Sequence, residues 1–359
     1  MYAADRVGES ARAEMHARCL ELLTWDPVCQ RSVSFAERLG QPLHTVHYLS
    51  YRRPAIAPIK YVLQFVKTLR LLRSLRPAMT LVSNPPPFAA LTAWLHHKIH
   101  GGHFAIDAHT GVFLEPKWRA FAPLNRFLIR RAAATIVTNE GLRDTISEWG
   151  GAPFVLPDRL PSLSTGGEFC FEPDTFNVAA IFSFYEDEPV AELLALRDLP
   201  AAMRIHVTGN SSRVPKRVKA SLSPQMHLTG FLPRDKYDAL VRGCDAVMVL
   251  CTRPHTMLCG AYEAAAAGKP LVTSESVAMR GEFTHGTIFV ENTVAGITRG
   301  LAEVYARHEL LTREMTELAA IMSVNWERRF AQCRSLLGDI ARSVAGFSQP
   351  SNPIRTVPK

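Results

Sequence analysis

The chain has 359 residues, of which 47% are hydrophobic and 21% are charged. This length and composition predict a folded protein of two domains and exclude an intrinsically disordered chain. No run of about 18 apolar residues is present, so no segment is expected to span a bilayer. The seven cysteines form no Cys-x-x-Cys pair and we find no signal peptide, which predicts a cytoplasmic protein without a disulfide framework.

Positive charge is concentrated in the first half of the chain. The net charge is +8, but residues 41–131 contain thirteen Lys or Arg and only two acids, a local charge of +11. The remainder therefore carries −3 (8 − 11). We expect the first half to meet an anionic partner such as a membrane surface. Nucleic acid is not expected, because no stacking aromatic residues alternate with the basic ones.

Short apolar segments alternate with helical segments up to residue 156, which predicts βαβ units and a parallel sheet. The expected strands are Cys19–Trp25, His44–Tyr51, Met79–Ser83, His103–Asp107, Thr135–Thr138 and Phe154–Leu156. The expected helices are Arg31–Leu39, Pro54–Arg76, Phe88–Ile99, Leu124–Ala134 and Gly141–Trp149.

The helix expected at Pro54–Arg76 is amphipathic and basic. On a helical wheel one side carries Val62, Phe65, Val66, Leu69 and Leu72, and the other carries Lys60, Gln64, Lys67 and Ser74. Two interpretations stay open: an ordinary domain helix with a solvated basic face, or a helix lying on anionic lipid. The candidate contacts to an acceptor or a membrane are Lys60, Lys67, Arg70, Arg73 and Trp118.

His109 follows the strand expected at His103–Asp107, in a polar loop where parallel sheets place ligands. Histidine is the side chain best suited to move a proton near neutral pH, so His109 is the candidate catalytic base. Asp107 is the candidate residue that orients its imidazole. Alternatively, His109 is a structural histidine bound to Asp107, and Glu115 is a second candidate base.

Four histidines, His96, His97, His100 and His103, lie close together, and His96 and His100 share one face of a helix. No carboxylate or cysteine stands beside them to complete a metal-binding set, and the chain has no Asp-x-Asp motif. We therefore expect no metal site.

The Pro/Gly/Ser-rich segment after residue 156 marks a domain boundary, beyond which the strand–helix alternation restarts. We expect an N-terminal domain of residues 1–157, a linker of residues 158–170, a C-terminal domain of residues 171–320, a helix of residues 321–344 that returns to the first domain, and a mobile tail of residues 345–359. A kink is expected at residues 322–325 of the long final helix.

A nucleotide site is predicted where the apolar strand Ala246–Cys251 leads through a loop into the helix Ala261–Ala267. A helix that starts at the carboxyl end of a parallel strand offers unpaired backbone N–H groups to phosphate. Gly260 opens this helix, and Glu263 in its first turn is better matched to a ribose diol than to phosphate. Gly209 forms a tight turn after another strand, where backbone can approach a ligand.

The second half resembles the donor domain of GT-B glycosyltransferases of the family-4 type. The resemblance rests on Gly230-Phe231-Leu232-Pro233, on the helix Asp235–Arg242 and on the stretch from Glu263-Ala264 to Gly268-Lys269-Pro270. It implies that Glu263 contacts the nucleotide ribose. The position eight residues earlier, a glutamate in that family, is His255 here, which departs from the pattern at the donor sugar. The donor-binding residues implied are Ser183, Gly209, Phe231, His255, Gly260 and Glu263, with Arg280 and the turn Gly281-Glu282 near the sugar.

A closer resemblance is to the eukaryotic β-1,4-mannosyltransferases that act on chitobiosyl-diphosphodolichol, which also lack the paired glutamates. The matching stretches are Asn84-Pro85-Pro86, Ile106-Asp107-Ala108-His109, Ser183–Glu188 and Thr208-Gly209. The amino-terminal membrane anchor of those enzymes has no counterpart here. The likeness implies a bacterial-type relative that binds peripherally to the inner face of the membrane.

These resemblances imply an α/β protein with the GT-B fold, two Rossmann-like domains facing each other across a cleft. The implied activity transfers a sugar from a nucleoside diphosphate sugar to a hydroxyl, on a lipid-linked acceptor in polysaccharide or glycoconjugate synthesis, without a metal or another cofactor. His109 is a base if the anomer inverts and a donor-sugar contact in retaining relatives. The alternatives are a non-catalytic membrane-associated GT-B scaffold that binds a glycolipid or a partner transferase, and a GT-B epimerase or phosphorylase.

Overall fold

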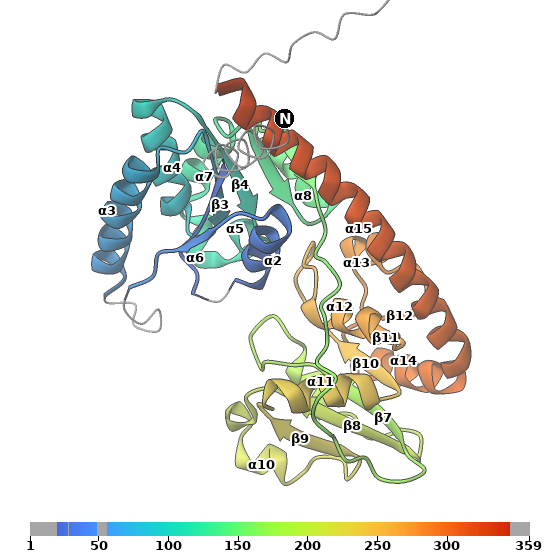
Figure 1. The fold of residues 1–359 in the computed structure, drawn as a ribbon. Coiled ribbons are helices and arrows are strands. Elements are labelled where there is room, and N and C mark those ends of the chain that lie inside the picture. Colours follow the sequence, from blue (N-terminus) through green and yellow to red (C-terminus); the bar gives the residue numbers. More distant parts are fainter. Residues whose placement is uncertain (1–19, 28, 49–55, 345–359) are drawn as a thin grey trace, which may run out of the picture. The chain divides into compact units, whose positions relative to one another are not determined.

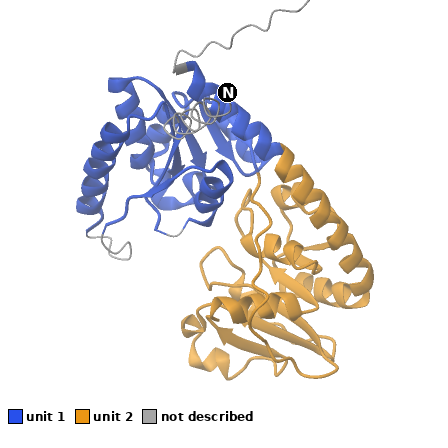
Figure 2. Ribbon diagram, viewed as in Figure 1, with its two compact units in different colours: residues 1–156, 329–359 blue, residues 157–328 orange. Residues whose placement is uncertain are grey.

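The structure is a computed structural model that describes residues 20–27, 29–48 and 56–344 (Figure 1). The chain divides into two compact units (Figure 2). Unit 1 comprises residues 1–156 and 329–359, and unit 2 comprises residues 157–328. The residues of the predicted tail, 345–359, lie outside the described part.

Unit 1 is built on a six-stranded parallel sheet in the order β2-β1-β3-β4-β5-β6. Because the chain reverses direction across the sheet between β1 and β3, the loops after these strands separate there and open a ligand position. The strands are β1 (Leu20–Thr24), β2 (Leu43–Thr45), β3 (Met79–Asn84), β4 (His103–Ala108), β5 (Ala134–Val137) and β6 (Pro153–Val155).

Helices cover the unit 1 sheet, and α4 packs against both α3 and α7 in one layer (Figure 1). The helix predicted to reach Ala134 ends at Ile129, because Ala134 already begins β5. The second strand is shorter than predicted, and the last residues predicted for it lie outside the described part. The helices are α2 (Gln30–Leu39), α3 (Ala57–Leu75), α4 (Pro87–His100), α5 (Gly111–Leu114), α6 (Pro116–Arg119), α7 (Ala122–Ile129) and α8 (Glu140–Glu148).

Helix α3 buries a face that only partly matches the apolar side of the helical wheel: Leu72 of that side is buried, and Lys67 and Ser74 of the polar side are exposed. Its buried residues are Lys60, Gln64, Thr68 and Leu72, whereas Ile59, Val62, Leu63 and Val66 are 40–62% exposed. The buried polar side chains of α3 form hydrogen bonds with residues that follow β1 and β2. Gln64 Nε2 donates to the Val46 carbonyl at 2.7 Å, and the Trp25 indole N–H donates to Thr68 at 2.9 Å. These hydrogen bonds satisfy buried polar groups that would otherwise destabilise the fold.

Unit 2 has a second six-stranded parallel sheet, in the order β12-β11-β10-β7-β8-β9. This is the 3-2-1-4-5-6 order of dinucleotide-binding folds read from the other edge, with the ligand position between β7 and β10. The strands are β7 (Phe176–Ala180), β8 (Met203–Thr208), β9 (Met226–Gly230), β10 (Ala246–Val249), β11 (Leu271–Ser274) and β12 (Thr287–Val290).

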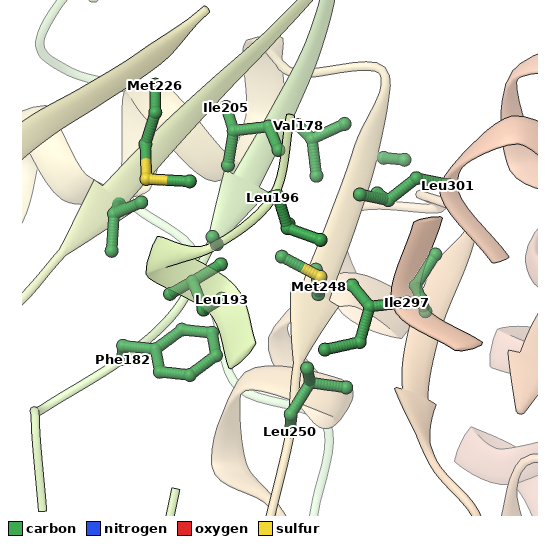
Figure 3. Close-up of a cluster of buried hydrophobic side chains, with 14 of the residues drawn as sticks. Val178, Phe182, Leu193, Leu196, Ile205, Met226, Met248, Leu250, Ile297 and Leu301 are labelled. Carbon is green, nitrogen blue, oxygen red and sulfur yellow. The ribbon is translucent and has the colours of Figure 1, made fainter. Parts of the chain in front are cut away.

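One core of unit 2 lies between its sheet and helices α9 and α14 (Figure 3). Leu193 from α9 and Ile297 and Leu301 from α14 meet Ile205 and Met248 of the sheet, and all five are fully buried. The helices of the unit are α9 (Val190–Leu194), η2 (Ser211–Arg213), α10 (Lys216–Lys219), α11 (Arg234–Gly243), α12 (Cys259–Ala266), α13 (Val277–Glu282), α14 (Val294–Ala306) and the first part of α15 (His308–Val344), which continues into unit 1.

The segment predicted as a linker, residues 158–170, is part of unit 2. Leu160, Leu163 and Phe169 pack against its core. The Ser164 N–H donates to the carboxylate of Asp238 at 2.8 Å, and Asp238 is only 1% exposed. This buried carboxylate attaches the segment to α11.

Helix α15 spans 37 residues without interruption at the predicted kink. Met315 and Leu318 near its start are buried in the core of unit 2. Phe330, beyond the division between the units, packs against Phe35 of α2 at 6.1 Å between ring centroids. In the described part of the chain, none of the helices has the length and apolar character needed to span a bilayer.

Candidate functional site

Four polar side chains meet at the carboxyl edge of the unit 1 sheet, at its β1/β3 switch point. They are Cys29 after β1, Ser83 at the end of β3, Asp107 at the end of β4 and His109 just beyond it. The imidazole Nε2 of His109 lies 3.3 Å from Ser83 Oγ, 3.4 Å from Asp107 Oδ2 and 3.9 Å from Cys29 Sγ. The His109 N–H donates to the Asn84 carbonyl at 2.9 Å, which holds the loop to β3.

Asp107 is buried and doubly engaged. Arg31 Nε donates to its two carboxylate oxygens at 2.9 and 3.2 Å, and Arg31 also donates to the Leu156 carbonyl. Burial raises the pKa of the Asp107 carboxyl, but the charge of Arg31 and the hydrogen bond with His109 outweigh it and hold the pKa at about 2. Asp107 is therefore a carboxylate at neutral pH and a fixed negative charge beneath the imidazole.

His109 is a cation in this setting. Burial lowers the pKa of the imidazole, but its contacts with Asp107 and Cys29 outweigh burial and raise that pKa to about 10. A group that is already protonated at neutral pH is poorly suited to remove a proton, so the general-base role is disfavoured. Nε2 faces the cluster, whereas Nδ1 makes no hydrogen bond to the described residues and the side chain is 31% exposed. The arrangement offers a substrate a charged N–H donor.

Sequence analysis missed Cys29, Arg31 and Ser83. Cys29 is the N-cap of α2, and its sulfur accepts hydrogen bonds from the Ser32 backbone N–H at 3.5 Å and the Ser32 hydroxyl at 3.1 Å. Burial raises the pKa of the Cys29 thiol, but His109 and Ser32 outweigh it and the pKa is lowered. The available signal was position: each of these residues ends or follows a strand at the switch point or begins the next helix.

The other titratable candidates of unit 1 are engaged elsewhere. Glu115, the alternative base, pairs with Lys117 at 2.7 Å. His97 contacts Thr80 Oγ1 at 3.0 Å and the Gly101 carbonyl at 2.8 Å, which makes it a structural histidine. In the described residues, no three His, Cys, Asp or Glu side chains come together in a set able to hold a metal ion.

The five candidate acceptor or membrane residues divide into two groups. Lys67, Arg70 and Arg73 are exposed on α3. Lys60 and Trp118 are each 7% exposed, so they do not form part of a membrane-facing surface. The Lys60 ammonium lies 5.6 Å from the centroid of the Tyr61 ring, which also packs against Trp118 at 6.4 Å. These two side chains complete an aromatic cluster inside the unit.

Two glycines permit close backbone approaches in unit 2. Gly209, after β8, has φ +94°, and a Cβ there would lie 2.0 Å from the Phe182 carbonyl oxygen. Gly260, in the first turn of α12, lies so close to Ile181 that a Cβ would approach the isoleucine side chain at 3.0 Å. Both glycines therefore hold the β8 turn and the start of α12 against the segment that follows β7.

The loop after β7 folds around a carboxylate of its own. Glu188 accepts hydrogen bonds from the Ser183 N–H at 2.9 Å and the Tyr185 N–H at 3.2 Å. Burial raises the pKa of the Glu188 carboxyl. The backbone N–H of Ser183, one of the predicted donor-binding residues, is thus occupied by Glu188.

Glu263, the predicted ribose contact, is mostly buried on α12 and has partners on α11. The Tyr237 hydroxyl donates to Glu263 Oε2 at 2.5 Å, and Arg234 lies 3.8 Å from Oε1. Burial raises the pKa of the Glu263 carboxyl. Phe231, just past β9, is 75% exposed and presents a free aromatic ring at the same carboxyl edge. His255 lies in the loop before α12 with a left-handed φ of 58°.

Arg280, predicted near the donor sugar, forms an ion pair with Glu275 and lies 4.3 Å from the centroid of the Phe289 ring. Gly281 and Glu282 lie in the last turn of the same helix, α13. Arg280 therefore has structural partners within unit 2.

Comparison of the whole fold gives several similar solved structures. Anabaena HepE in complex with UDP matches with a TM-score of 0.63 and 13% identity, over 92% of this chain and 100% of that one. Sucrose-phosphate synthase from Thermosynechococcus elongatus matches with a TM-score of 0.72 and 11% identity, over 90% of this chain and 100% of that one. A glycosyltransferase from Rickettsia africae matches with a TM-score of 0.60 and 10% identity, over 90% of this chain and 98% of that one. No protein-family model and no curated protein sequence matches the chain.

These similarities establish the fold. The chain forms two Rossmann-like α/β units, each built on a parallel sheet, and the match covers almost the whole chain. This is the architecture of GT-B glycosyltransferases. The predicted fold class is confirmed at this level. At 10–13% identity the likeness carries no assignment of substrate or residue role.

Proposed function

We propose that the protein is a glycosyltransferase that moves a sugar from a nucleoside diphosphate sugar to a hydroxyl group of an acceptor. The observation that carries the proposal is the carboxyl edge of unit 2. Glu263, the Gly209 turn and the exposed ring of Phe231 all lie at this edge. A structure of the same fold, Anabaena HepE, was solved with UDP.

Each donor-side residue has a role that follows from its chemistry. Glu263 accepts hydrogen bonds from the ribose diol, and Phe231 stacks on the base. The N-cap residue of α12, Leu258, makes no side-chain capping hydrogen bond, so the first N–H groups of the helix are available to phosphate. These N–H groups and nearby basic side chains would stabilise the departing diphosphate without a metal ion.

In unit 1, His109 would act as a charged hydrogen-bond donor rather than as a base. Its raised pKa, about 10, and its free Nδ1 support contact with a hydroxyl or phosphate oxygen of the substrate. Asp107 would hold the imidazole in place and keep it charged. This role matches the histidine that contacts the donor sugar in retaining relatives.

The proposed acceptor is a lipid-linked glycan at an anionic membrane on the cytoplasmic side. Support comes from α3, where the exposed apolar residues Ile59, Val62, Leu63 and Val66 continue into the exposed cations Lys67, Arg70 and Arg73. Apolar side chains insert at a lipid interface while basic ones meet anionic headgroups, each adding about 1 kcal/mol. The likeness to the eukaryotic mannosyltransferases stays a prediction, since the structural matches do not single that group out.

A non-catalytic scaffold of the same fold is the alternative. His255 in place of the usual glutamate supports it, because that position meets the donor sugar in the family the chain resembles. A scaffold would bind nucleotide or glycolipid without turnover.

Thermal unfolding with UDP, GDP, TDP or ADP, each with and without EDTA, tests the donor site. We expect one nucleotide to raise the Tm of the protein regardless of chelator, and Glu263→Gln to reduce that shift. Glu303→Gln, on the exposed face of α14, is the matched control. If no nucleotide shifts the Tm at millimolar concentration, the transferase proposal fails. Nucleotide binding without turnover on any acceptor would favour the scaffold.

A further inference from the structure

Cys29 is positioned to react, and the proposed reaction has no use for it. Its sulfur lies 3.9 Å from His109 Nε2 and receives two hydrogen bonds from Ser32. It also caps the N-terminus of α2, where the partial positive charge of the helix favours an anion.

Titratable side chains from the loop after β4, from α2 and from α15 surround Cys29. His109 faces it from the loop after β4, with Asp107 behind the imidazole. Arg31, the second residue of α2, is neutralised by its pairing with Asp107. Cys333 of α15 is buried beside the same Asp107–Arg31 pair, and burial raises the pKa of its thiol to about 12. Cys333 is thus a neutral neighbour, and His109 is the cation that acts on Cys29.

We propose that Cys29 is a peroxide-sensitive thiolate and that its oxidation to a sulfenic acid is a redox switch on the His109 site. A thiolate–imidazolium pair is the arrangement that makes cysteines nucleophilic at neutral pH. Susceptibility to peroxide follows thiolate character and access. Cys29 is 8% exposed, which restricts the reagent to small molecules.

The proposed step balances with the groups present and one peroxide. The Cys29 thiolate attacks one peroxide oxygen, an S–O bond forms and the O–O bond breaks. The sulfur is oxidised by two electrons while the peroxide is reduced. The departing hydroxide takes the Nε2 proton of His109 and leaves as water. The products are a sulfenic acid and a His109 without the thiolate that helped to hold its charge, and a dithiol reductant reverses the oxidation.

The first test measures reactivity on the full-length protein and does not depend on the proposed function. Iodoacetamide alkylation is followed by peptide mass spectrometry from pH 5 to 9, with the exposed Cys170 as internal reference. We expect Cys29 alkylation to level off at lower pH than that of Cys170. In His109→Gln we expect Cys29 to react about tenfold more slowly at pH 6, because the imidazolium that favours the thiolate is gone. His103→Gln, at the exposed start of β4, is the matched control.

Should His109→Gln fail to fold, nuclear magnetic resonance of His109 in Cys29→Ser gives the same answer. Serine caps a helix well, so the fold is expected to persist. We expect the pKa of His109 to be lower in Cys29→Ser than in the wild type. An unchanged His109 pKa, or alkylation of Cys29 that follows Cys170 across the pH range, would overturn the proposal.

The second test measures the switch. After treatment with hydrogen peroxide, dimedone should label Cys29 in the wild type, and dithiothreitol added before dimedone should prevent the label. Transferase activity, which rests on the proposed function, should fall with the label and return with dithiothreitol. Cys29→Ser, compared with its own untreated activity, should resist peroxide. Labelling of Cys29 without loss of activity would refute the switch while leaving the transferase proposal intact.

Discussion

The hydroxyl of Tyr237 on α11 donates a hydrogen bond to Glu263 Oε2 on α12, while the guanidinium of Arg234 lies 3.8 Å from Oε1. Tyr237 thus fixes the rotamer of a carboxylate that is largely buried, so that a ribose hydroxyl meets an acceptor already in place.

This relationship predicts a difference between two substitutions. Glu263→Ala should raise the donor KM about tenfold and change kcat little, since ribose binding is expected to be equal in the ground and transition states. Tyr237→Phe should raise the donor KM less and lower the unfolding free energy by about 1 kcal/mol. Steady-state kinetics with saturating acceptor, together with urea unfolding, measures both. A larger effect on kcat than on KM in Glu263→Ala would contradict the ribose role.

The charge state of His109 predicts the pH dependence of turnover. With a pKa of about 10, the imidazolium persists through the neutral range. The kcat should therefore stay level from about pH 6 to 9 and fall only as the pH approaches 10, and His109→Ala should lower kcat about 10²-fold. A rise in kcat with a midpoint near pH 6.5 would instead identify His109 as the base.

Asp107 predicts how stability responds to acid. Its pKa in the folded protein, about 2, lies below the ordinary value of 3.8. The carboxylate therefore contributes stability at pH values above its unfolded pKa, and that contribution is lost as the pH falls from about 4 through 2. The contribution is about 2 kcal/mol. Urea unfolding between pH 2.5 and 6 should show a shallower acid dependence in Asp107→Asn.

The control for Asp107 is Asp144→Asn, which alters a carboxylate that pairs with Arg143 on the surface of α8. Surface pairs contribute little, so its acid dependence should match the wild type. Equal slopes in all three proteins would mean that Asp107 is not held as a carboxylate.

The outward face of α3 predicts membrane binding. Replacing Lys67, Arg70 and Arg73 with Gln should weaken binding to phosphatidylglycerol vesicles about 100-fold, from about 1 kcal/mol per charge. Val62→Glu with Leu63→Glu should also abolish binding in high salt, because it removes the apolar part. Sedimentation with vesicles measures both, and Val324→Glu at an exposed position of α15 is the control. Equal binding by all variants would exclude α3 as the contact.

The close approach at Gly209 predicts a stability effect. Gly209→Ala places a Cβ against the Phe182 carbonyl oxygen in a left-handed backbone, and should cost about 1–3 kcal/mol of unfolding free energy. Gly281→Ala meets no atom within 4 Å in a helix and should be neutral or slightly stabilising. Thermal unfolding of the two variants distinguishes the predictions, and equal Tm values would show that the Gly209 turn relaxes freely.

The fold could be predicted from the sequence because strands and helices alternate, and because burial of one side gives each of them a local pattern of hydrophobic residues. The orientation of α3 could not be predicted, because a helical wheel separates apolar from polar residues without showing which side meets the sheet. What turns the helix is the need of the Val46 carbonyl and the Trp25 indole for polar partners, which no local pattern records. The burial of Trp118 could not be predicted for a similar reason, since it depends on packing against Tyr61, a distant residue.

The candidate site of unit 1 was predicted in part. Asp107 and His109 are near neighbours in sequence, and the structure brings them together at 3.4 Å. Cys29 lies 80 residues from His109 along the chain, and only the order of the strands makes them neighbours. The charge of His109 follows from these neighbours, so the sequence pointed to the residue but not to its protonation.

Helix α15 has a consequence for the order in which the protein is made. Unit 1 is discontinuous: its first 156 residues leave the ribosome well before residues 329–344, which bring the buried Phe330, Cys333 and Leu337 to it. Unit 2 is contiguous and can complete its core during synthesis. Until residue 330 has emerged, the face of α2 that carries Phe35 lacks its partner. A nascent chain stalled before residue 329 would therefore expose an apolar surface and recruit chaperones.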